Sequence, residues 1–184
     1  MVSFQFGWFF DPIFTGDYPL IMREQIDLKC KAEGLQTSRL PRFSPAWQQK
    51  LKGSWDFLGL NYYAANLVRH EIGNGTGWAA DMDANRYEPE YWPKGASEWL
   101  KVTPLSFRKI LGWIKNTYGN PPLYVTENGF SDREVDGPHD PRRADYFVRY
   151  INQMLKAVLL DGCNVKGYTA WSLMDNFEWL DGYS

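Results

Sequence analysis

The sequence lacks the features that would assign it to several large classes of protein. Its 184 residues hold no stretch apolar enough to span a bilayer, and the opening MVSFQFGWFF has no basic leader with a small-residue cleavage site. The net charge of −2 gives no electrostatic case for nucleic acid or an anionic membrane as a partner. We therefore expect no membrane span and no nucleic-acid binding. The sequon Asn74-Gly75-Thr76 hints that a full-length parent is secreted, and the compartment otherwise stays open.

Cysteine and histidine are also scarce, with two residues of each. Cys30 and Cys163 have no metal-ligand spacing and no nearby histidine. This pattern is more typical of buried free thiols than of a disulfide or of metal ligands. We expect neither a metal nor another cofactor.

Aromatic residues are abundant, at 17% of the chain, and nine of them are tryptophans. Tryptophan usually anchors a hydrophobic core, and this is the ordinary interpretation of most of the nine. The excess also suits a cleft for a ligand with flat C–H faces, which sugars have.

Turn residues divide the chain into alternating helices and strands. Asp17, Thr103 and Asp140 are the predicted helix caps, and glycines follow three of the helices. The segment 70–93, rich in Gly, Asn, Asp and Pro, is predicted to be a long loop. Helices are predicted over 19–33, 45–52, 104–118 and 141–161, and strands over 55–63, 123–129 and 165–173. The apolar stripe of the last helix comprises Phe147, Tyr150, Ile151, Met154, Leu155 and Val158.

This alternation predicts parallel βα units, as in a (β/α)8 barrel. In such a barrel the carboxyl ends of the strands share one face, which carries the chemistry. Polar and aromatic side chains stand at the end of each predicted strand or just beyond it: Asn61, Tyr63, Glu127, Trp171, Glu178 and Trp179. Carboxylates beside aromatic platforms are typical of glycoside hydrolysis.

Each of these residues also has an ordinary structural interpretation. Glu127 could be half of a structural ion pair, and Glu178 could be a solvated loop charge. Asn61 and Tyr63 could be ordinary residues at the end of a strand. Trp171 could be part of the core, as could Trp179. Spacing alone indicates a fragment of a βα enzyme, with carbohydrates as the candidate substrate class.

Five stretches resemble glycoside hydrolase family 1, the retaining β-glycosidases that include β-glucosidases, lactase-phlorizin hydrolase and myrosinases. They appear in the order of that family and run from near the first residue to the last. The T-E-N-G motif and the A-W-S-L-x-D-N-F-E-W run are each specific. The stretches are GWFFDPIFTGDYP, SRLPRFS, DFLGLNYY, LYVTENGF and AWSLMDNFEWLDGYS.

The resemblance implies a role for each candidate residue. Glu127 resembles the catalytic nucleophile, which attacks the anomeric carbon, and Tyr63 resembles the tyrosine that bonds it. Asn61 matches a nearby glycone-site asparagine, and we expect its amide to stabilise Glu127 as well. Three tryptophans and a second glutamate match substrate-binding residues: Glu178 and Trp179 for the terminal sugar, Trp171 beneath it, and Trp99 on the aglycone side.

The second carboxyl of the retaining mechanism is missing. The family carries its acid/base in a T-x-N-E-P motif on an earlier strand, and this sequence has none. The only approximations, at Glu88 and Glu90, lie in the predicted loop. The family's early histidine and arginine are also missing, since His70 and His139 both stand in loop contexts. A full barrel takes about 250 residues. Residues 1–184 therefore resemble the C-terminal part of such a barrel, incomplete at both ends and holding roughly the last three βα units.

Three hypotheses follow. In the first, the chain is part of a β-glycosidase that hydrolyses a β-glucoside or a related substrate. The chain by itself is then inactive, because it lacks the acid/base. Alternatively, it is a non-catalytic klotho-like sugar-binding or receptor module, or an inert truncated fragment. The intact T-E-N-G glutamate favours descent from an enzyme. The sequence leaves the sugar, the aglycone and the oligomeric state open.

Overall fold

The computed structural model describes residues 1–132 and 139–183. The chain divides into two compact units, residues 1–56 with 66–87 and residues 57–65 with 88–184. Within the described residues no helix is long and apolar enough to cross a membrane. Cys30 and Cys163 are both buried and free, as expected.

The first unit is mainly helical. Its core gathers apolar side chains from several segments, with Phe4, Met22, Ile26 and Cys30 among its buried residues. A short antiparallel hairpin pairs Leu67 with Tyr87 at its open end. The elements are η1 (Ser3–Gly7), α1 (Trp8–Thr15), α2 (Leu20–Ala32), α3 (Pro45–Leu51), β2 (Leu67–His70), α4 (Trp78–Asp81) and β3 (Ala84–Tyr87).

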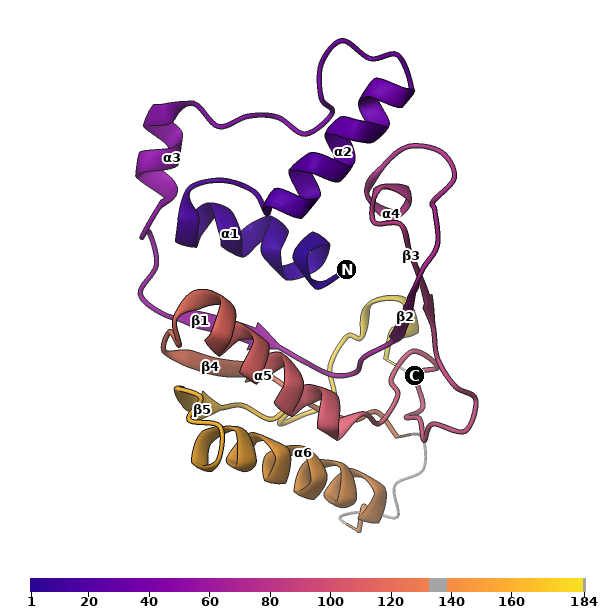
Figure 1. Ribbon diagram of the computed structural model, residues 1–184. Helices are drawn as coiled ribbons and strands as arrows, with labels where there is room; N and C mark the ends of the chain where they lie inside the picture. The colour runs from indigo at the N-terminus through magenta and orange to yellow at the C-terminus, as the bar shows by residue number, and fades with distance from the viewer. Residues whose placement is uncertain (133–138, 184) are drawn as a thin grey trace. The chain divides into compact units, whose positions relative to one another are not determined.

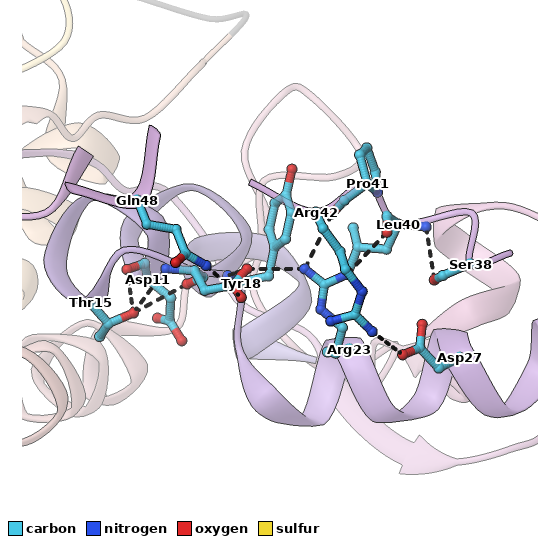
Figure 2. Close-up of polar contacts among 11 residues, drawn as sticks. Asp11, Thr15, Tyr18, Arg23, Asp27, Ser38, Leu40, Pro41, Arg42 and Gln48 are labelled. Atoms are coloured by element: carbon cyan, nitrogen blue, oxygen red, sulfur yellow. Dashed lines mark hydrogen bonds and ion pairs between the residues drawn. The ribbon is translucent and has the colours of Figure 1, made fainter. Parts of the chain in front are cut away.

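A buried arginine on α2 holds the first unit together. The Arg23 guanidinium donates to the carbonyls of Leu40 (3.0 Å) and Pro41 (3.2 Å), and it pairs with Asp17 at 3.0 Å. Figure 2 shows Arg23 reaching the 40–41 segment, with Asp27 on the same helix bound to Arg42. These bonds satisfy a charge that would be costly to bury without partners.

The second unit is an open parallel sheet with two helices. Its strands lie in the order β1 (Leu58–Asn61), β4 (Leu123–Glu127) and β5 (Val165–Tyr168), and both pairings are parallel. The helices α5 (Pro104–Tyr118) and α6 (Pro141–Leu159) lie side by side along it, and a short 3-10 helix, η2, spans Trp179–Asp181 (Figure 1). The parallel order confirms the predicted βα architecture.

One face of this sheet is buried and the other is exposed. Leu60 of β1 and Val125 of β4 are buried, as are Phe107, Leu111 and Ile114 of α5. The alternate strand positions are exposed: Gly59, Asn61, Tyr124 and Thr126. An uncovered face on parallel strands is unusual, because parallel sheets are normally buried on both sides.

Several local predictions were wrong. The first strand covers 58–61 rather than 55–63 and is buried on one face only. The third ends at Tyr168, before Trp171. Residues 70–93 are not simply a loop, because His70 pairs with Ala84 in the β2–β3 hairpin and α4 lies between these strands.

Helix details also differ from the prediction. Asp140 does cap α6, accepting a bond from the Arg143 amide, but Asp17 does not cap α2. Thr103 stands at the cap position of α5 without a capping bond. On α6, Leu155 is exposed although it was assigned to the apolar stripe.

Candidate active site

The carboxyl ends of the three parallel strands meet, and this brings the predicted site residues together. Asn61 at the end of β1 stands in register with Glu127 at the end of β4, and the Tyr62 amide donates to the Glu127 carbonyl (2.9 Å). Beyond β5, the Trp171 amide donates to the Asn128 carbonyl (2.8 Å). The backbone thus fixes the segments that carry Asn61 and Tyr63, Glu127, and Trp171.

Glu127 is bonded by a phenol. The Tyr63 hydroxyl donates to Glu127 Oε2 at 2.6 Å, a distance typical of a charge-assisted bond. Burial raises the pKa of Tyr63 well above its ordinary value, and the bond to Glu127 and the charges of Glu127 and Glu178 raise it further. Tyr63 therefore stays a neutral hydrogen-bond donor to the carboxylate across the physiological pH range.

Asn61 has a different partner from the one expected. Its Oδ1 accepts a hydrogen bond from the Thr126 hydroxyl at 2.6 Å. Asn61 lies in register with Glu127, yet the bond that reaches the Glu127 carboxylate among the described residues comes from Tyr63. Among the described residues, the expected hydrogen bond from the Asn61 amide to the Glu127 carboxylate is therefore not formed.

The candidate tryptophans are exposed, and two of them contact other candidate residues. The ring of Trp99 meets that of Tyr63 edge to face, with centroids 5.7 Å apart. Trp171 Nε1 donates to Glu178 Oε1 at 3.2 Å, so Glu178 is a bonded carboxylate rather than a free loop charge. Trp179, in η2, is 82% exposed. None of these indoles is a core residue, and the nine tryptophans are all absent from the buried set of the described chain.

Gly129 allows the segment after β4 to approach the segment after β5. It forms a parallel bridge with Trp171, and a Cβ built on it would lie 1.9 Å from the Trp171 carbonyl oxygen. A side chain at position 129 would therefore displace Trp171.

The carboxyls that approximate the missing acid/base lie elsewhere. Glu88 does have a strand before it, contrary to expectation, but β3 belongs to the antiparallel hairpin and not to the β1-β4-β5 sheet. The Glu88 carboxylate forms an ion pair with the Lys101 ammonium at 3.6 Å. Within the described residues no group of His, Cys, Asp or Glu could hold a metal ion.

The sequence analysis missed the residues beneath the site. Asn128, Tyr146 and Tyr150 are buried and bond to the backbone around Tyr63. Asn128 was treated as part of a motif without a contact of its own, and Tyr146 was left out of the apolar stripe. The spacing of Tyr146 and Tyr150, four residues apart on one helix face, was the available signal.

The site combines a carboxylate bonded by a phenol with a second carboxylate and exposed indoles. Paired carboxylates are typical of glycoside hydrolases. The site stands at the carboxyl ends of parallel strands, where barrel enzymes carry their chemistry. A profile of glycosyl hydrolase family 1 matches residues 1–184, and the chain belongs to that family.

Known proteins resemble the whole chain. Human lactase/phlorizin hydrolase is 43% identical over 187 residues, which cover 100% of this chain and 10% of that protein. The structure of an aphid myrosinase has a TM-score of 0.87 at 42% identity and covers 99% of this chain. The structure of β-glucosidase 2 from the fungus Trichoderma reesei, in complex with Tris, has a TM-score of 0.84 at 41% identity and covers 98%.

The chain spans 39% of the length of each of these two structures. The similarity confirms the expected fold class, a partial (β/α)8 barrel of a glycoside hydrolase. Over the described residues its parallel strands form an open sheet and not a closed barrel.

Proposed function

We propose that the full-length protein is a retaining β-glycosidase of the β-glucosidase type and that this chain supplies its nucleophile, Glu127. Residues 1–184 are then the C-terminal part of one barrel, incomplete at both ends. The observation that carries the proposal is the 2.6 Å bond from Tyr63 to Glu127 at the carboxyl ends of the parallel strands. The β-glucosidases among the similar proteins support it.

In this mechanism Glu127 forms a covalent bond to the sugar. Tyr63 occupies Oε2, which leaves Oε1 to attack the anomeric carbon. The bond from that carbon to the leaving oxygen breaks, and an acid on the upstream part of the barrel protonates the oxygen. The same group, now a base, removes a proton from water, which displaces Glu127 and releases the sugar with its original configuration. Tyr63 holds the carboxylate without donating its proton to it, because burial keeps the phenol a weak acid.

The remaining residues bind the substrate in this proposal. Trp171 lies under the terminal sugar, and Glu178 and Trp179 grip its hydroxyls. Trp99 faces the leaving group, and Asn61 contacts the glycone. Glu178 is suited to accept hydrogen bonds from sugar hydroxyls because the Trp171 indole already fixes one of its oxygens.

A non-catalytic sugar-binding module is the second candidate. The exposed indoles and the missing T-x-N-E-P motif favour it. A binding module has no need of a phenol bonded to a carboxylate at the end of a strand, which is why we prefer the enzyme. An inert fragment would retain neither sugar binding nor chemistry.

The test uses a fused enzyme, in which this whole chain follows the part of Trichoderma reesei β-glucosidase 2 that precedes the matched region. A slow 2-deoxy-2-fluoroglucoside is expected to leave its sugar on Glu127, because the fluorine slows release of the covalent intermediate. Peptide mapping by mass spectrometry locates the label. A label on Glu178 would reverse the roles assigned to the two carboxylates, and binding without any label would favour the sugar-binding module.

Tyr63→Phe in the fused enzyme is expected to lower kcat by about 10- to 100-fold, because it removes one hydrogen bond to a charged group and leaves the attacking oxygen in place. Steady-state kinetics on an aryl β-glucoside measure the change. Tyr124→Phe, on β4 with its ring packed edge to face against Phe57, is the matched control and should change kcat by less than twofold. A Tyr63→Phe enzyme with unchanged kcat would contradict the role of this phenol.

A further inference from the structure

Two tyrosines of α6 lie directly beneath the candidate site. Tyr146 and Tyr150 stand four residues apart, on the same face of the helix, and are 1% and 0% exposed. Their rings stack with centroids 4.0 Å apart at 21°. Tyr150 also packs against Phe107 of α5 and Tyr62. The rings are core, but their hydroxyls need partners because they are removed from water.

Both hydroxyls donate to one acceptor, the backbone carbonyl of Tyr63. The distances are 3.1 Å from Tyr146 and 3.0 Å from Tyr150. Asn128 Nδ2 donates to the Tyr146 hydroxyl (2.9 Å), and the Thr103 amide donates to that of Tyr150 (2.7 Å). Each hydroxyl oxygen accepts one of these hydrogen bonds, and each hydroxyl donates to Tyr63, because a carbonyl oxygen can only accept.

Asn128 joins this network to all three strand ends. It follows Glu127 directly and is fully buried. Its Nδ2 also donates to the Tyr62 carbonyl (2.7 Å), and its Oδ1 accepts from the Tyr168 hydroxyl of β5 (2.7 Å). The network therefore connects the residue beside Glu127 with the backbone that carries Tyr63.

We infer that Tyr146 and Tyr150 are positioning residues for Glu127: by holding the Tyr63 carbonyl from below, they set the place from which the Tyr63 phenol meets the carboxylate. This inference rests on the proposed function. A bond of 2.6 Å weakens steeply when its groups move apart, and a displacement of about 1 Å is enough to impair a catalytic arrangement. Two donors on one carbonyl oxygen restrict that movement in a way that apolar packing does not.

Tyrosine-to-phenylalanine changes separate the hydroxyls from the rings. Tyr146→Phe and Tyr150→Phe keep the stacked rings and remove the hydroxyls, and with them the bonds to Tyr63 and the bonds accepted from Asn128 and Thr103. Tyr118→Phe is the matched control, since Tyr118 is a buried tyrosine at the far end of α5 whose ring packs against Trp113. Circular dichroism and thermal unfolding verify that each fused variant is folded.

Hydrogen exchange tests the positioning without any reference to activity. The reporters are the amides of Tyr62, bonded to the Glu127 carbonyl, and Ala65, bonded to Thr103 Oγ1 at 3.0 Å. In the Tyr146→Phe/Tyr150→Phe double variant both should exchange about tenfold faster than in Tyr118→Phe, the factor expected when a buried hydrogen bond is lost. Equal exchange in the two variants would overturn the inference.

A double-mutant cycle tests the route to catalysis. Tyr150→Phe should lower kcat about tenfold when Tyr63 is present, with little change in KM, and less than about threefold in the Tyr63→Phe background. A drop of the same size in both backgrounds would show that Tyr150 does not act through Tyr63, and would overturn the inference. A fused parent that neither hydrolyses nor is labelled refutes the proposed function instead, and hydrogen exchange then still decides the positioning role.

Discussion

Glu127→Gly in the fused enzyme is expected to lower hydrolysis of an aryl β-glucoside by on the order of 10⁴-fold or more, because removal of a nucleophile abolishes the covalent route. Added azide should restore turnover, since the glycine leaves space for a small anion on the face from which Glu127 attacks. The product should be the glucosyl azide of inverted configuration, because a single displacement replaces two. Release of the aryl group and NMR of the product measure both effects.

The matched control is Glu178→Gly. This variant also removes a carboxylate from the site, but one that bonds Trp171 and is assigned to sugar binding. Its KM should rise, and azide should leave its rate unchanged. Azide rescue of Glu178→Gly, or the absence of rescue in Glu127→Gly, would refute the assignment of the nucleophile.

The 184-residue chain alone should not hydrolyse an aryl β-glucoside faster than its own Glu127→Gln variant. General acid catalysis typically raises the rate 10²–10⁴-fold. Among the described residues at the ends of the parallel strands, we assign no carboxyl as the general acid. The two proteins should give the same rate, while the same substitution in the fused enzyme abolishes activity. Hydrolysis by the chain alone that Glu127→Gln removes would disprove this and would require an acid within the chain.

The strand-end positions of the site could be predicted because they follow from simple rules. Apolar strands separated by helices predict a parallel sheet, and parallel strands end on one face. Tyr63 and Glu127 were therefore expected to lie near one another, and they are in contact. The strand boundaries were less accurate, because apolar composition continues beyond the residues that pair.

Other features depend on contacts that a linear pattern does not contain. Residues 70–93 have the composition of a loop, and only the pairing of β2 with β3, from Leu67–Tyr87 to His70–Ala84, makes a sheet there. The predicted stripe included Tyr150 and the exposed Leu155 but not the buried Tyr146, because spacing alone does not fix where the buried face of a helix ends. Thr126 was the partner of Asn61 because it lies on the neighbouring strand, which side-chain type alone cannot reveal.

The close approach of Gly129 to Trp171 has a genetic consequence. Its backbone conformation is open to any residue, and only the Trp171 carbonyl excludes a Cβ. Every missense change that a single nucleotide can make in a glycine codon adds at least that carbon. In a gene whose product is still used, drift at codon 129 should therefore be confined to silent third-base changes, whereas a decaying copy should accumulate replacements there as fast as at Gly112, where a Cβ would meet no atom within 4 Å. Sequencing this one codon across alleles and duplicated copies would separate a maintained gene from an abandoned one.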